Sequence, residues 1–136
     1  MSLDILKMKY AFAFCFVKRI VWADEILVES EKAYIEEWFP KTLFYALGLH
    51  TQEDLDRYYQ LAYTRISSLL SKDEKKEVFG LLLGACVADD YLDFREFSIL
   101  DEAAKLLEIS NQHMFELMEY FLEANMTTFG ASLVEP

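Results

Sequence analysis

Glycine, proline, cysteine and histidine are scarce in this chain of 136 residues, which has four Gly, two Pro, two Cys and two His. So few turn-forming residues leave little room for loops, and together with 54% hydrophobic residues they favour a compact, mostly helical protein. Two cysteines provide neither a disulfide framework nor a zinc site. We therefore interpret Cys15 and Cys86 as buried, inert thiols in a reducing compartment.

Long hydrophobic runs are also missing. The longest uncharged apolar run, residues 10–17, ends at Lys18 and Arg19 and is too short for a transmembrane helix. It makes a poor secretory signal, because Asp4 precedes it and no small-residue cleavage site follows. We therefore expect a cytoplasmic protein that does not span a membrane.

Basic charge is in short supply, with 13 Lys and Arg against 24 Asp and Glu and a net charge of −11. The first 68 residues hold eight basic and ten acidic side chains, whereas the last 68 hold five basic and fourteen acidic ones. An acidic surface repels phosphate backbones, so nucleic-acid binding is not expected. Cations or basic protein surfaces are the partners that such a surface attracts, unless the charge only maintains solubility.

Signatures of catalysis are absent from the sequence. There is no G-x-S-x-G motif and no glycine-rich phosphate loop. His50 and His113 cannot belong to the Glu-x-x-His pairs of a di-iron bundle, since Leu47 and Ser110 stand three residues before them. We predict no catalytic residue and no enzymatic activity.

What the chain does contain is one acidic motif twice, in residues 23–31 and 88–96. Four positions match at one fixed offset. They are Ala23, Asp24, Leu27 and Glu31 in the first copy, and Ala88, Asp89, Leu92 and Glu96 in the second. Because apolar helical patterns flank each copy, the repeat predicts two units that each contain a helix, a short acidic turn and a second helix.

Hydrophobic periodicity and capping residues predict the helices. Helices are expected over about residues 4–23, 29–39, 51–70 and 71–88, with two more beginning after Asp93 and Ser110. Thr51, Ser71, Asp93 and Ser110 are the expected caps. One apolar face of the helix over 29–39 should consist of Tyr34, Ile35, Trp38 and Phe39. Pro40 should separate a short helical segment over 41–47, which Gly48 should end.

These elements predict an all-α, single-domain bundle of six or seven helices. Two pseudo-repeated three-helix units, about residues 4–70 and 71–126, should share one core, with a frayed tail over 127–136. A single unit could not bury both faces of its helices, so no internal domain boundary is expected.

The acidic turns place carboxylates at the C-termini of helices, where the helix dipole disfavours them. One interpretation is structural, with the acids closing turns and capping the next helix. The other is a divalent cation such as Ca²⁺ or Mg²⁺. The candidate metal ligands are Asp89, Asp90, Asp93 and Glu96, with Asp24 and Glu31 as a weaker set. No EF-hand pattern is present.

The duplicated motif resembles that of the TerB-like (tellurite-resistance) family, whose pattern is Ala-Asp-Gly, an apolar residue, and a Glu seven residues after the Asp. The resemblance covers about residues 12–122, but Glu25 and Asp90 stand where the family usually has glycine. It implies a helical bundle in a bacterial cytoplasm and a link to stress or tellurite resistance. It also implies a location near the membrane face, which the protein would reach through its partners. It also implies a divalent-metal role for the acidic turns and a sensory or scaffolding function.

We therefore expect a non-enzymatic TerB-like module that binds protein partners in a cytoplasmic stress response. One alternative is a small metal-dependent hydrolase that uses the second acidic turn. Another is an apolar-ligand or oligomerisation module, in which an uncovered aromatic stripe forms a homodimer interface or holds a partner helix. The stripe would consist of Tyr58, Tyr59, Tyr63, Phe115 and Tyr120.

Overall fold

The computed structural model of the chain describes residues 2–23, 28–88 and 94–129, with side chains up to Phe121. Within these ranges it confirms an all-α protein without strands. The helices are α1 (Leu3–Val21), α2 (Glu29–Trp38), α3 (Lys41–Ala46), α4 (Gln52–Leu69), α5 (Lys72–Cys86), α6 (Phe94–Leu106) and α7 (Asn111–Phe129). None of these helices is long and apolar enough to cross a membrane.

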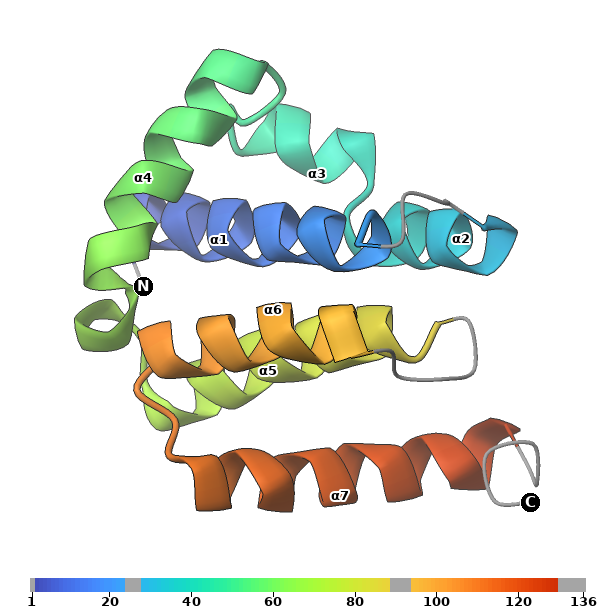
Figure 1. The fold of residues 1–136 in the computed structure, drawn as a ribbon. Coiled ribbons are helices and arrows are strands. Elements are labelled where there is room, and N and C mark those ends of the chain that lie inside the picture. The colour runs from blue at the N-terminus through green and yellow to red at the C-terminus, as the bar shows by residue number, and fades with distance from the viewer. Residues whose placement is uncertain (1, 24–27, 89–93, 130–136) are drawn as a thin grey trace.

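The helices form stacked layers (Figure 1). α1 and α2 make one layer and α5 and α6 the next, while α7 lies against the outer side of α5. On the opposite side, α4 runs across α1, and α3 lies between the α1–α2 layer and the start of α4. α1 packs on α4, α5 and α6, and α5 packs on α1, α2, α6 and α7. These two helices therefore form the centre of the bundle.

Local capping explains where the helices begin. The predicted caps Thr51, Ser71 and Ser110 each accept a hydrogen bond from the backbone N–H three residues later, at 3.2, 3.2 and 3.1 Å. Each bond satisfies one of the free N–H groups at a helix start. These three caps are confirmed, whereas Asp93 lies outside the described residues.

Two helices end in the same kind of left-handed turn. Gly48 has a φ of 69°, and the backbone N–H of Leu49 donates a hydrogen bond to the carbonyl of Phe44, five residues earlier, at 2.8 Å. Glu108 has a φ of 57°, and the backbone N–H of Ile109 donates the equivalent hydrogen bond to the carbonyl of Ala104 at 2.9 Å. Both turns have the hydrogen bond of a Schellman motif. Gly48 is confirmed as a helix stop, while Glu108 adopts a conformation that favours glycine.

The core lies between α1 and its neighbours. Phe12 and Phe16 are fully buried there, with ring centroids 4.7 Å apart, as expected for residues one helical turn apart. Phe14 lies on another face of α1 and contacts Phe39 and Phe44 instead. The alternating phenylalanines of this segment therefore belong to a helix with two apolar faces, one in the core and one toward α2 and α3. The core also includes apolar residues of α4, α6 and α7 and of the connection after α6, namely Leu55, Ala62, Ile66, Leu100, Ala104, Leu107, Met114, Leu117 and Met118.

Candidate functional site

Most of the predicted metal ligands belong to the two acidic turns. Outside the described residues lie Asp24, Asp89, Asp90 and Asp93. In the part of the chain that the structure describes, no three His, Cys, Asp or Glu side chains are grouped so that they could hold a metal ion. Cation binding at the second turn therefore stays a prediction.

Glu31 and Glu96, which end the two copies of the motif, are described and nearly fully buried. Each is the third residue of its helix and has only 2% of its surface exposed. Glu31 Oε1 accepts a hydrogen bond from the backbone N–H of Val28 at 3.1 Å. The positive end of the helix dipole also favours a carboxylate at this position. This contact gives Glu31 a structural role at the start of α2.

A hollow of about 490 Å³ lies beside the connection from α2 to α3, where this connection meets α1. Its floor is mainly apolar, because α1 contributes one phenylalanine, α2 an isoleucine, and the connection after α2 a second phenylalanine. We call it the apolar hollow. Its lining residues are Phe14, Lys32, Ile35, Glu36, Phe39, Pro40 and Lys41.

A second hollow of about 370 Å³ adjoins the first and lies among α1, α3 and the start of α4. It contains two lysines and a histidine, and no carboxylate is among its described lining residues. We call it the basic hollow. It is lined by Phe14, Lys18, Phe39, Lys41, Phe44, Tyr45, Leu49, His50, Thr51, Gln52 and Leu55. The two hollows share Phe14, Phe39 and Lys41, and together we call them the lysine-rimmed groove.

An aromatic cluster forms the wall between the hollows. The Phe14 ring centroid lies 5.4 Å from that of Phe39 and 4.7 Å from that of Phe44. Phe39 and Phe44 are themselves buried, so the wall is anchored in the core. Lys18 Nζ lies 5.4 Å from the Phe14 ring centroid, within reach of a cation–π interaction. The groove is therefore bounded by rigid apolar groups with cations beside them.

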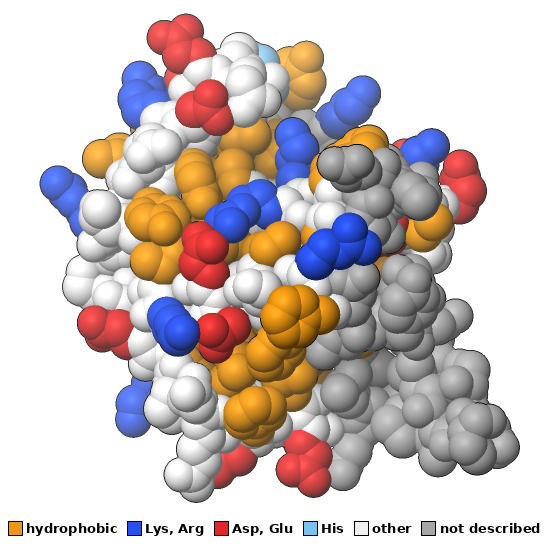
Figure 2. Space-filling model, viewed as in Figure 1, with side chains coloured by type: hydrophobic (Ala, Val, Ile, Leu, Met, Phe, Trp, Pro, Cys, Tyr) orange, Lys and Arg blue, Asp and Glu red, His pale blue; other side chains and the backbone are white. Residues whose placement is uncertain are grey.

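The charge of the groove is opposite to that of the whole chain. Its described lining includes three lysines and one histidine against a single carboxylate, Glu36. Lys18 and Lys41 form no ion pair with another described residue. Lys32 Nζ lies 3.5 Å from Glu29, whose side chain is almost fully exposed. In Figure 2, Lys and Arg side chains gather on the upper part of the face shown, over α1, α3 and α4.

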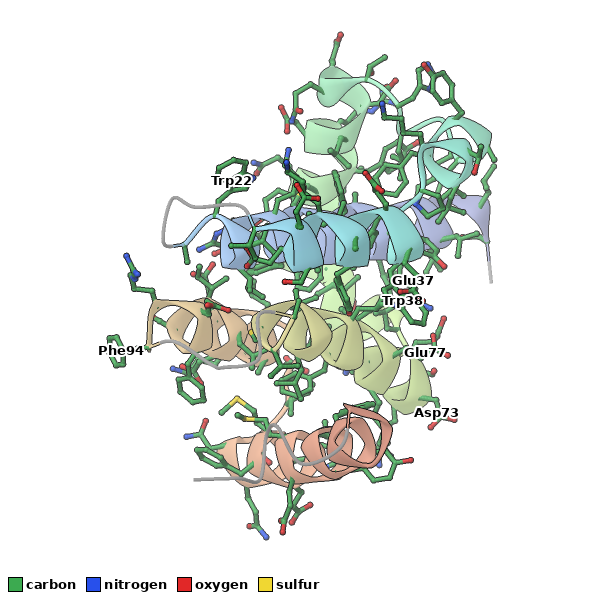
Figure 3. All side chains as sticks on the ribbon, turned by 90° about the vertical axis from the view of Figure 1, so that its right-hand side faces the viewer. Trp22, Glu37, Trp38, Asp73, Glu77 and Phe94 are labelled. Carbon is green, nitrogen blue, oxygen red and sulfur yellow. The ribbon has the colours of Figure 1, made fainter. Side chains whose placement is uncertain are left out.

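α2 presents a different surface on its other side. Figure 3 shows Glu37 and Trp38 at the end of α2, above Glu77 and Asp73 of α5. Trp38 keeps 49% of its surface exposed, although the sequence predicted it on the same apolar face as Phe39. The predicted single face is therefore divided. One side of α2 borders the groove, and the other lies beside Asp73 and Glu77 of α5, of which Glu77 forms an ion pair with Lys9 at 2.7 Å.

The five aromatic residues of the predicted interface stripe come from two helices. Tyr58 and Tyr59 of α4 are half-buried, and Tyr63 beside them is 38% exposed. On α7, Phe115 and Tyr120 are 56% and 67% exposed. The exposed part of the stripe therefore lies mainly on α7.

Of the two cysteines predicted to be buried, only Cys86 is fully buried. Cys86 is fully buried in α5, and Cys15 is half-buried in α1. Burial raises the pKa of Cys15 to about 11, although Lys18 opposes this shift. Because the thiolate is the reactive form, the raised pKa lowers the reactivity of Cys15, while burial shields Cys86 from solvent.

The sequence reasoning missed the groove. Its signal is present in residues that recur every three or four positions, namely Phe14 and Lys18 on α1, and Lys32 and Ile35 on α2 with Phe39 directly after it. Such spacing places apolar and basic residues on one helix face. It does not show that α2 and α3 fold back beside that face of α1.

Comparisons with models of known families, with curated proteins and with solved structures find no match for this chain. The resemblance to the TerB-like family therefore depends on the two copies of the motif and on the helical pattern around them.

Proposed function

We propose that the chain is a non-enzymatic TerB-like helical module that binds protein partners in a cytoplasmic stress response of the tellurite-resistance type. The observation that carries the binding function is the lysine-rimmed groove, in which two adjoining hollows have an apolar floor and a rigid aromatic wall. Grooves of this kind accept the apolar side chains of a partner segment, as in helix-in-groove recognition.

The shape of the groove favours a protein segment over a small ligand. The two hollows, of about 490 and 370 Å³, fall within the range of roughly 300–1,000 Å³ for ligand pockets. Small-molecule sites, however, bury roughly 70–90% of the ligand surface, whereas both hollows are open to solvent along one side. A partner segment laid across both hollows would bury its apolar side chains and keep its polar face in water.

Several structural parallels support the proposal of two TerB-like units, residues 4–70 and 71–126. Glu31 and Glu96 occupy the same position in α2 and α6 and are equally buried. Gly48 follows α3 and Glu108 follows α6, and both residues adopt the same left-handed turn. The break around Pro40 that separates α2 from α3 has no counterpart in the continuous α6, and α3 supplies one side of the groove.

Site-specific photo-crosslinking tests the proposal. A photoreactive phenylalanine analogue replaces Tyr45, which lines the basic hollow, or Tyr120 on α7 as a matched control. These tyrosines are 64% and 67% exposed, so their access to solvent is nearly the same. We expect covalent adducts with one or a few proteins from position 45 and none from position 120 in cells. Equal adducts from both positions, or none from either, would contradict the proposal.

An enzymatic assay separates the proposal from the hydrolase alternative. The protein is incubated with common phosphoester and amide substrates, with and without Mg²⁺ or Mn²⁺. We expect no turnover. A metal-dependent turnover that Asp89→Ala abolishes would contradict the non-enzymatic proposal.

A further inference from the structure

We propose that the occupant of the lysine-rimmed groove is an acidic amphipathic helix of a protein partner. Its apolar side chains enter the apolar hollow, and its carboxylates face Lys18, Lys32 and Lys41. This inference rests on the proposed function, because it names the chemistry of the segment that the module binds.

The charge of the groove complements that of an acidic segment. Acidic residues outnumber basic ones by 24 to 13 in the chain, yet three lysines and only one carboxylate, Glu36, are in the described lining of the groove. The groove is therefore a local positive site on an acidic protein. Complementary charge steers association and fixes the register of a partner.

The lysines are available for a new carboxylate. Lys18 and Lys41 have no ion-pair partner among the described residues, and Lys18 lies beside the Phe14 ring. Lys32 pairs only with the exposed carboxylate of Glu29, at 3.5 Å. An exposed pair of this kind contributes little to stability, so a partner carboxylate can replace it. Docking would thus break no buried interaction of these lysines.

The distribution of apolar and basic residues matches an amphipathic helix. Ile35, Phe39 and Pro40 offer apolar contacts in one hollow, while Lys18 and His50 offer cationic or donor groups in the other. In a helix, residues three or four positions apart share a face, so apolar and acidic residues can form adjacent stripes on one segment. A single helix can therefore supply both kinds of contact.

The rest of the surface restricts where an acidic helix can bind. On the other side of α2, Glu37 and Trp38 adjoin Asp73 and Glu77 of α5 (Figure 3). Glu77 forms an ion pair with Lys9 at 2.7 Å, which leaves Glu37 and Asp73 as the carboxylates that oppose an acidic segment beside the exposed Trp38 ring. A second copy of the chain is the competing occupant, since it could present Glu37 and Asp73 to the groove.

Peptide selection on the intact chain tests the proposal. A displayed library of helix-forming peptides is selected on the wild-type protein, and binding of the selected peptides is measured by fluorescence polarisation. The test variant is Lys18→Glu with Lys41→Glu. The control is Lys72→Glu with Lys76→Glu, which changes the net charge equally on exposed positions of α5 outside the groove. Circular dichroism confirms that both variants are folded.

We expect the selected peptides to be rich in Asp and Glu and to carry at least two large apolar residues on one helical face. Their affinity should fall by about tenfold or more on Lys18→Glu with Lys41→Glu, because each reversal replaces attraction by repulsion. The Lys72→Glu and Lys76→Glu control should bind like the wild type, and added NaCl should weaken binding.

Other outcomes overturn the inference in distinguishable ways. The selected peptides could lack acidic enrichment, bind the Lys18→Glu and Lys41→Glu variant like the wild type, and lose affinity for Ile35→Ala. This result would overturn the proposal that the partner is acidic, but it would leave the protein-binding function of the groove intact. If neither Ile35→Ala nor the lysine variant changes the affinity of any selected peptide, the groove is not the binding site and the proposed function fails too. Wild-type self-association that the lysine variant removes, measured by sedimentation, would make a second copy the occupant.

Discussion

Arg19 of α1 and Glu102 of α6 form a bidentate ion pair, in which Nη1 lies 2.9 Å from Oε2 and Nη2 lies 2.9 Å from Oε1. The hydroxyl of Tyr63 on α4 donates to the same carboxylate at 3.4 Å. The Arg19 guanidinium also lies 4.9 Å from the Phe16 ring centroid. One polar cluster therefore connects α1, α4 and α6, and it adds directional contacts to the apolar packing of these helices.

A double-mutant cycle with Arg19→Ala and Glu102→Ala should give a coupling energy of about 0.5–1 kcal/mol at neutral pH, since the pair is bidentate but partly exposed. The hydrogen bond from Arg19 lowers the pKa of Glu102 below its ordinary value of 4.5. A carboxyl group with a lowered pKa in the folded state stabilises that state above its unfolded pKa, and this contribution is lost as the pH falls through the lowered value. Urea unfolding should therefore show the coupling at neutral pH and its loss in strong acid. A coupling that does not change with pH would contradict this assignment.

Two glycines of α5 should respond differently to alanine. A Cβ at Gly84 would overlap the hydroxyl of Tyr34 and lie 2.8 Å from its Cζ, and Tyr34 is held by a hydrogen bond to the Leu81 carbonyl at 2.6 Å. A Cβ at Gly80 would lie 2.9 Å from the tip of the Phe121 ring, which can move. Gly84→Ala should lower the free energy of unfolding by about 1–3 kcal/mol. Gly80→Ala should be nearly neutral, because helix propensity offsets the contact. If urea unfolding shows that both variants lose the same free energy of unfolding, then the hydrogen-bonded Tyr34 is not the cause of the loss at Gly84.

The two left-handed turns give a pair of opposite predictions. Gly48→Ala should destabilise the protein by about 1 kcal/mol, because alanine disfavours a positive φ. The added Cβ would meet only Lys7 Nζ at 3.6 Å, an ordinary contact, so the backbone causes the loss. Glu108→Gly should stabilise the protein by about 0.5–1 kcal/mol through relief of the same strain. Thermal unfolding of both variants measures the signs, and a destabilised Glu108→Gly would contradict the argument.

Cys15 should resist alkylation in the folded protein. Its pKa of about 11 leaves little thiolate at about pH 8, and burial also limits access. Iodoacetamide labelling followed by mass spectrometry should be slow in buffer and fast in urea, where the pKa returns to its ordinary value. Rapid labelling of Cys15 without denaturant would show that the thiol is accessible and ionised.

Divalent cations should raise the melting temperature at constant ionic strength if the second acidic turn binds them through Asp89, Asp93 and Glu96, with Asp90 assisting. At one hundred times the dissociation constant the gain is about 2.7 kcal/mol, or several degrees for a domain of this size. Asp89→Asn with Glu96→Gln should remove the rise. Because Glu96 is buried, each variant is compared with itself, with and without Ca²⁺ or Mg²⁺. If the divalent cation raises the melting temperature no more than NaCl of the same ionic strength, the acidic turns have only a structural role.

The sequence predicted what depends on neighbouring residues. Thr51, Ser71 and Ser110 cap helices because a hydroxyl can reach an N–H three residues later in any helix start. Gly48 ends a helix because it tolerates the left-handed conformation. The turn at Glu108 gave no such signal, since a glutamate does not indicate a positive φ.

The groove could not be predicted from local pattern. It arises because the α2–α3 connection brings Phe39 and Lys41 beside Phe14 and Lys18 of α1. Sequence spacing placed these residues on helix faces but did not specify which faces meet. The same ambiguity misplaced Trp38, whose helical position suits either the core or the exposed surface beside α5.

Hydrogen exchange on the intact chain, with and without the protein captured at Tyr45, tests the central claim most directly. Backbone amides from the end of α2 through α3 to the start of α4 should exchange more slowly in the complex, because the partner would cover the lysine-rimmed groove. Amides around Phe115 and Tyr120 of α7 should be unchanged. Protection on α7 with no change between α2 and α4 would contradict the account and place the interface on the exposed aromatic residues instead.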